Sequence, residues 1–65
     1  MSETQHKERI FEEIRKHPEG LTIMSISKNT KISRVTASKY IMVLLAEGMI
    51  EQRMVGTAKL CYPKR

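Results

Sequence analysis

The sequence predicts an α+β domain in which three helices are followed by a C-terminal β-hairpin. Three observations predict it. Apolar residues recur at helical spacing, a serine or threonine precedes each expected helix as a cap, and apolar and polar residues alternate in period two after Gly48. The 65 residues are expected to form one domain, residues 1–65. A domain of this size buries only roughly 60% of its unfolded surface, so it is marginally stable alone.

The first helix is expected to begin near the N-terminus and to run as far as His17. Ser2 and Gln5 have the spacing of a capping box. The apolar residues that follow at helical spacing are Ile10, Phe11 and Ile14. Pro18 disfavours helical geometry at the preceding residue, so residues 17–20 are expected to form a loop.

The second helix is expected over residues 23–30, "IMSISKNT", after a very short strand at residues 21–22. Thr22 is placed to cap this helix. The segment is weak by propensity because its serines, asparagine and threonine compete for their own backbone groups. Packing of Ile23 and Ile26 is therefore expected to hold the helix in place.

The third helix is expected to start after Ser33 as its cap and to run to about Glu47, with Gly48 as a left-handed stop. Helical spacing puts one apolar set on a common face: Ala37, Ile41, Leu44 and Leu45, flanked by Tyr40. The opposite face carries Val35, Ser38, Lys39 and Met42. The second half of the helix thus anchors the core, while the first half presents polar and basic residues. For the exposed Met42, contact with a thymine methyl, contact with a partner subunit and simple exposure all remain open.

In the remaining segments, "MIEQRM" and "KLCYP", apolar and polar residues alternate in period two. Together with "VGTA" between them, this pattern predicts a β-hairpin. With a three-residue loop, one set of residues would face inward: Ile50, Met54, Leu60 and Tyr62. Arg53, Val55 and Lys59 would then face outward.

The composition favours an anionic partner and offers no catalytic site. Twelve Lys and Arg against seven Asp and Glu give a net charge of +5, which suits nucleic acid or an acidic surface. The single cysteine, Cys61, excludes an internal disulfide, and with His6 and His17 it shows no metal-ligand spacing. There is no phosphate-cradling glycine loop. We therefore expect no metal, no cofactor and no enzyme activity.

No apolar run approaches membrane-spanning length, and the N-terminal segment is too polar for a secretory signal. We therefore expect a soluble cytoplasmic protein that makes no membrane contact.

From the first helix to Tyr62 the chain resembles the winged helix-turn-helix domains of bacterial and archaeal transcription regulators. The resemblance is most specific in "SRVTASKYIMVLLAEGMIE". The family typically shows a similar Ser-Arg-x-Thr start, Ile or Leu at Ile41, Leu at Leu44, and "EGLI" where this chain has "EGMI". Two residues depart from the pattern. Lys31 stands where a turn glycine is usual and would have to adopt a left-handed conformation, and Thr30 replaces a usual core leucine.

The resemblance implies that this chain binds double-stranded DNA as a transcription regulator, with its third helix in the major groove. The positions that match the groove-facing half are Ser33, Arg34, Val35, Thr36, Ser38 and Lys39. The positions that match the wing, the hairpin that lies on an adjacent groove or on the backbone, are Arg53, Thr57 and Lys59. Arg34 can donate two hydrogen bonds to guanine, while the hydroxyls of Thr36 and Ser38 can bond a base edge or a phosphate.

The alternative function is a winged-helix docking module within a larger protein assembly, because fold alone does not define function. A docking helix would be expected to present apolar or acidic residues. This one presents Arg34 and Lys39, and it carries no acidic residue before Glu47.

The working unit is expected to be a homodimer. A single winged helix contacts one short half-site, and the chain contains no further domain that could pair two copies. The expected pairing surfaces are the Ile10, Phe11 and Ile14 stripe and the tail at residues 61–65. The alternative is a monomer whose core takes up the whole stripe.

Overall fold

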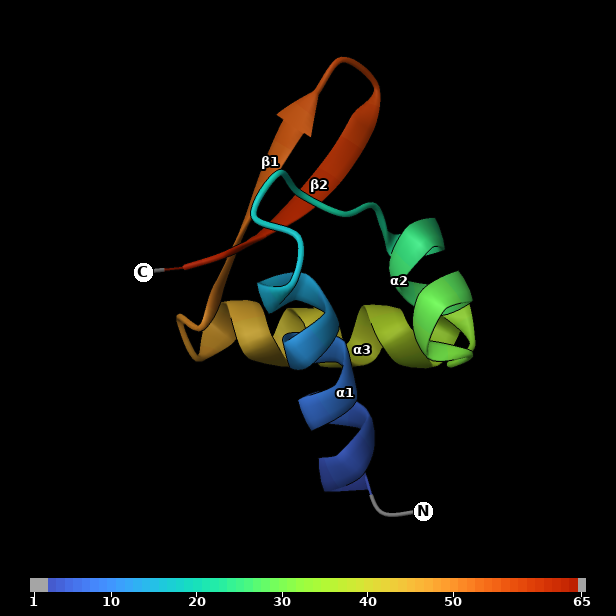
Figure 1. The fold of residues 1–65 in the computed structure, drawn as a ribbon. Coiled ribbons are helices and arrows are strands. Elements are labelled where there is room, and N and C mark those ends of the chain that lie inside the picture. Colours follow the sequence, from blue (N-terminus) through green and yellow to red (C-terminus); the bar gives the residue numbers. More distant parts are fainter. Residues whose placement is uncertain (1–2, 65) are drawn as a thin grey trace.

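The chain folds as three helices followed by two antiparallel strands, which confirms the predicted α+β layout. The computed structural model describes residues 3–64, with side chains from residue 5 onward, so the predicted Ser2 cap lies outside the described residues. Helix α1 crosses α3, and the hairpin extends away from the helices (Figure 1). The elements are α1 (Glu3–Arg15), α2 (Ile23–Thr30), α3 (Arg34–Ala46), β1 (Ile50–Val55) and β2 (Ala58–Pro63).

Helix α1 ends at Arg15, two residues before the predicted His17. The His17 amide donates to the Ile14 carbonyl at 3.1 Å, three residues back, so the last turn tightens before Pro18. The loop then closes with a hydrogen bond of 2.9 Å from the Gly20 amide to the His17 carbonyl.

The predicted short strand is a single bridge at Leu21. Its amide and carbonyl exchange hydrogen bonds of 3.0 and 2.7 Å with Cys61, which puts β2 between β1 and Leu21. Thr22 is the cap of α2, as predicted, and its side chain accepts a hydrogen bond of 3.2 Å from the Ser25 amide. Before the bridge, Gly20 has φ +104°, and a Cβ there would lie 2.8 Å from the Tyr62 ring. The loop can approach β2 only with glycine at this position.

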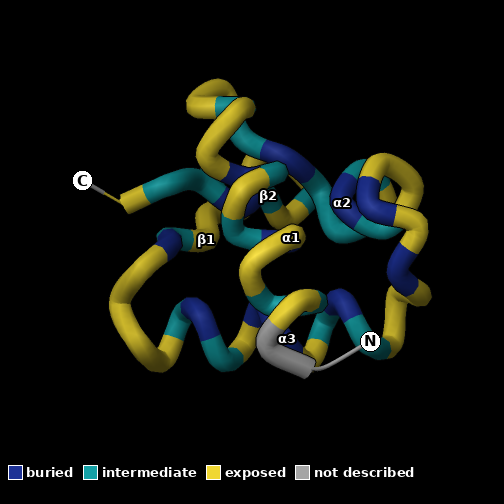
Figure 2. Tube along the Cα trace, turned by 60° about the horizontal axis from the view of Figure 1, so that its bottom comes forward, coloured by how far each residue is buried: buried dark blue, intermediate teal, exposed yellow. Residues whose placement is uncertain are grey.

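The core lies where the three helices meet β2. Figure 2 shows buried positions gathered there, while the hairpin turn and the segment between α3 and β1 are exposed. Its fully buried large side chains are Ile10, Ile14, Ile26, Leu44 and Cys61. The predicted core face of α3 is confirmed at Ala37, Tyr40, Ile41 and Leu44, and Leu45 is partly buried.

The stripe on α1 is taken up by this core. Ile10 and Ile14 are both 0% exposed, and Phe11 is partly buried against the core. Cys61, the first residue of the expected pairing tail, is 1% exposed. The prediction that the two isoleucines and Cys61 form a pairing surface is therefore wrong, because packing within one chain already covers them.

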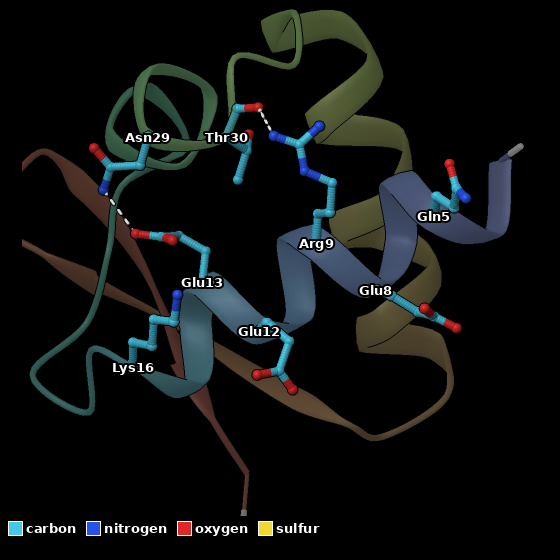
Figure 3. Close-up of a pocket in the computed structure, with 8 residues that line it drawn as sticks. All are labelled: Gln5, Glu8, Arg9, Glu12, Glu13, Lys16, Asn29 and Thr30. Carbon is cyan, nitrogen blue, oxygen red and sulfur yellow. Dashed lines mark hydrogen bonds between the residues drawn. The ribbon is translucent and has the colours of Figure 1, made fainter. Parts of the chain in front are cut away.

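Side chains from α1 and α2 hold the turn that joins α2 to α3. Lys31 has φ 60° and ψ 29°, which confirms the expected left-handed conformation. The Arg9 guanidinium donates a hydrogen bond of 2.5 Å to the Thr30 carbonyl at the end of α2 (Figure 3). The Ser27 hydroxyl donates one of 2.6 Å to the Ile32 carbonyl. One carbonyl that the end of α2 leaves without an intrahelical partner, and one carbonyl of the turn, are thereby satisfied.

Thr30, the polar substitute for a core leucine, is 4% exposed. Its hydroxyl donates a hydrogen bond of 2.7 Å to the Ile26 carbonyl one turn earlier, so burial leaves the donor satisfied. Next to it, the Asn29 amide donates to Glu13 of α1 at 3.0 Å (Figure 3). The Asn29–Glu13 bond, together with the bond from Arg9 to the Thr30 carbonyl, attaches the polar end of α2 to α1.

The hairpin has a two-residue loop instead of the three residues used for the predicted register. Val55 pairs with Ala58, which leaves Gly56 and Thr57 as the loop. Gly56 has φ +64°, the backbone conformation that a type II′ turn requires at its first central position.

The shorter loop reverses which β2 residues face the helices. Cys61 is buried beside Ile50, and Leu60 and Tyr62, which were expected inward, lie on the opposite face of the hairpin. Met54 shares the Ile50 face but lies near the loop and is 61% exposed. Lys59, expected outward, lies on the Ile50 face and remains exposed.

The left-handed turn leads to a stability prediction. Lys31→Gly should raise the free energy of unfolding by about 0.5–1 kcal/mol, because glycine adopts positive φ without the Cβ clash that costs about 1–2 kcal/mol in other residues. The melting temperature should rise by roughly 2–8 °C. Lys28→Gly is the matched control, since it removes the same charge from an exposed helical position and should cost about 1 kcal/mol. Thermal unfolding followed by circular dichroism tests both variants, and a Lys31→Gly protein that melts lower than the parent would contradict the strain argument.

Candidate nucleic-acid interface

The first turn of α3 begins at the predicted cap. Ser33 has φ −58° and ψ 152°, and its hydroxyl accepts a hydrogen bond of 3.3 Å from the Thr36 amide. The same hydroxyl donates to the Thr36 hydroxyl at 3.0 Å. Both side chains are engaged in starting the helix, yet Ser33 is exposed and the Thr36 hydroxyl keeps its own proton for an outside acceptor.

The face of α3 opposite the core is open. Val35 is 84% exposed and Met42 is 67% exposed, and helical spacing puts Ser38 between them. Arg34 is also exposed, and it lies with Val35 and Ser38 around a hollow that Ile23 of α2 closes on one side. The N-terminal half of α3 therefore presents hydrogen-bonding, basic and apolar groups to the outside.

A groove separates this face of α3 from the hairpin. It has a volume of about 520 Å³, and Ser38 and Met42 from α3 face Gln52 and Lys59 from the hairpin across it. Ile23, Ile41 and Leu45 complete the groove. The structure thus brings two predicted residues, Ser38 and Lys59, to opposite walls of one groove.

Gln52 is a groove residue that the sequence analysis missed. It pairs with Cys61 across the hairpin, and its amide lies 3.8 Å from the Cys61 sulfur. The missed signal is the strand alternation itself, because with Ile50 and Met54 expected inward, period two puts Gln52, midway between them, on the same face.

The other predicted hairpin residues lie apart from the groove. Arg53 is on the opposite face, with its guanidinium 5.7 Å from the centre of the Tyr62 ring and 4.0 Å from a Glu51 carboxylate oxygen. Thr57 is exposed in the turn. The three residues expected to act together on the wing therefore point in different directions.

Lys39 and Thr36 occupy the flank of α3 that lies away from the hairpin. The Lys39 ammonium is 5.4 Å from the centre of the Tyr40 ring, while its side chain remains exposed. The two residues can thus reach a ligand on the side of α3 opposite to the Lys59 side.

The segment that contains this face carries charge of one sign. Residues 20–46, which contain α2, the turn and α3, include no acidic residue but four basic ones: Lys28, Lys31, Arg34 and Lys39. Glu47, just beyond α3, lies 2.6 Å from the Lys7 ammonium. Glu19, just before this segment, accepts a hydrogen bond of 3.0 Å from His17. The pKa of the Glu19 carboxyl is lowered, first by a hydrogen bond with its own backbone and second by the bond from His17. The flanking carboxylates are therefore paired away from the open face of α3.

Groups suited to covalent or metal chemistry do not gather near the groove. Burial raises the pKa of the Cys61 thiol, which keeps it protonated and a poor nucleophile. Within residues 5–64, His, Cys, Asp and Glu side chains form no group of three that could hold a metal ion. The mixed charges that line the hollow between α1 and α2 include Arg9 and Glu13, which bond to α2 (Figure 3).

Among the helices of residues 3–64, none has the length and apolar character needed to cross a bilayer. Comparison of the chain with protein-family models, with curated proteins and with solved structures finds no match. The fold and the chemistry of the α3 face are therefore what indicate a function.

Proposed function

We propose that this chain is a sequence-specific double-stranded DNA-binding protein of the winged helix-turn-helix class, acting as a small transcription regulator in the cytoplasm without a cofactor. The observation that carries the proposal is the open, acid-free face of α3, which combines Arg34, Ser38 and Val35 and adjoins a groove lined by Lys59. Cationic and hydrogen-bonding groups on one exposed helix suit a polyanion whose base edges are accessible.

In this mechanism α3 enters the major groove, which is about 12 Å wide and admits one helix. Arg34, in the first turn, donates to the two acceptors of a guanine, and Ser38 bonds a neighbouring base edge or phosphate. Lys39 and Lys59 lie on opposite flanks of α3 and contact the phosphates on either side of the groove. The hairpin lies on the backbone or the minor groove, with Thr57 in its exposed turn and Arg53 on its outer face.

Protein docking is the second candidate function, and one observation favours it. Exposed apolar side chains interrupt the polar surface, with Val35 at 84%, Met42 at 67% and Met24 of α2 at 63% exposure. Such groups are also common in protein interfaces. Docking gives no reason for an acid-free basic surface over α2 and α3, so we favour DNA.

The first functional prediction concerns salt. About three phosphate contacts per copy should give a roughly 40-fold loss of duplex affinity between 50 and 200 mM monovalent salt, because each neutralised phosphate releases condensed counterions. A gel-shift titration with random and selected duplexes measures this. Duplex affinity that hardly changes over this range would rule out the phosphate mechanism and favour docking.

The second prediction separates base reading from phosphate contact. Arg34→Ala should cost about 1–3 kcal/mol on the preferred site and relax the preference at one base position. Lys59→Ala should weaken all sequences alike and lower the salt slope by about 1. Lys16→Ala is the charge-matched control, because Lys16 lies in the hollow between α1 and α2. Binding to a library of single-base site variants distinguishes them, and a uniform loss in both Arg34→Ala and Lys59→Ala would refute base reading by Arg34.

The third prediction concerns pairing. Because Ile10 and Ile14 are buried within one chain, we propose that two copies pair on a two-fold DNA site rather than in free solution. Sedimentation equilibrium at micromolar concentration should give a mass near 7.5 kDa without DNA. With a duplex that holds two half-sites about one helical turn apart, two copies should bind. A mass of twice the monomer without DNA would show instead that the free protein pairs through another surface.

A further inference from the structure

Val35 occupies a position where its side chain adds nothing to the fold. It lies in the first turn of α3, opposite the core, and is 84% exposed, the most exposed of the large hydrophobic residues in the described part of the chain. A β-branched residue also lowers helix stability, because its χ1 rotamers are restricted against the preceding turn. Core packing and helix propensity give little reason for valine here, and the exposed side chain is open to contact with a ligand.

The surroundings of Val35 define what that ligand must offer. Arg34, Val35 and Ser38 lie with Ile23 around an open hollow, so apolar side chains lie beside two hydrogen-bond donors. The acid-free stretch of residues 20–46 gives the surface a positive charge. A fitting partner is therefore anionic overall, carries acceptors for Arg34 and Ser38, and places a small apolar group beside them.

Duplex DNA has one such group in its major groove. Thymine displays its C5-methyl next to the O4 acceptor, whereas the other bases carry no methyl group on that edge. We infer that Val35 is a specificity-determining residue that packs on a thymine methyl in the base pair next to the guanine read by Arg34. This inference rests on the proposed DNA-binding function. It adds the identity of the base, thymine, that Val35 selects.

The test removes the methyl from the DNA. A preferred duplex is first selected from a random pool with the unaltered protein, and each thymine in the protected site is then replaced in turn by deoxyuridine. Loss of one buried methyl corresponds to about a fourfold drop in affinity, which is expected at one thymine per half-site. Val35→Ala shortens the side chain without disturbing the helix. For this variant, replacing that thymine by deoxyuridine should leave the affinity unchanged.

Val55→Ala is the matched control. It makes the same side-chain change at another exposed valine, on the face of the hairpin away from α3, and it should retain the full deoxyuridine effect. The free energy of unfolding of Val35→Ala, measured by thermal melting, should also lie within about 0.5 kcal/mol of the parent value. A change in binding is then not caused by a change in folding.

The outcomes separate the inference from the proposed function. Failure to bind any duplex overturns both and favours docking. Duplex binding in which no deoxyuridine replacement matters, or a preferred site without thymine next to the Arg34-dependent guanine, overturns the Val35 assignment and leaves DNA binding intact. A deoxyuridine effect that persists unchanged in Val35→Ala overturns it as well, because another residue then contacts the methyl.

Discussion

The left-handed turn at Lys31 is the constraint on which the arrangement of α2 and α3 depends. With φ at 60°, this one residue redirects the chain so that the cap of α3, Ser33, follows two residues later and the helix begins at Arg34. The turn would be costly alone, since a non-glycine residue is strained there. Hydrogen bonds from Arg9 to the Thr30 carbonyl and from Ser27 to the Ile32 carbonyl offset that strain. The direction of α3 is thus set by polar contacts with α1 and α2 as well as by apolar packing.

Helix α3 serves both as a core element and as the exposed surface. Ala37, Ile41 and Leu44 fill the core, and the opposite face, with Val35 and Met42, is left open. A chain of 65 residues has few apolar groups to bury, so leaving two of them exposed lowers the stability that the core can reach. This cost is understandable if the open face is reserved for a partner. The same limited supply explains why α1 commits Ile10 and Ile14 to the core and presents mostly charged residues outside.

The two-residue turn decides what the hairpin contributes to the α3 face. Because side chains alternate along a strand, a change of one residue in loop length exchanges the two faces of β2. With Gly56 and Thr57 as the loop, Cys61 enters the core, Lys59 and Gln52 line the groove beside α3, and Arg53 lies on the far side. The Gly20 approach to Tyr62 and the Leu21 bridge to Cys61 then hold this register against the helices. The loop before α2 and the hairpin therefore depend on each other.

The sequence by itself determined the number, order and type of the elements, the caps at Thr22 and Ser33 and the core face of α3. These follow from local chemistry: hydroxyl caps and apolar spacing. The left-handed Lys31 was expected from the resemblance alone, because a glycine is usual at that position. The tertiary structure alone decided that Cys61 is buried, that Arg53 and Lys59 lie on opposite faces of the hairpin, and that the α1 stripe is covered. Strand register depends on one residue of loop length, and whether an apolar stripe is buried depends on the elements that pack against it, so neither can be obtained from a segment considered alone.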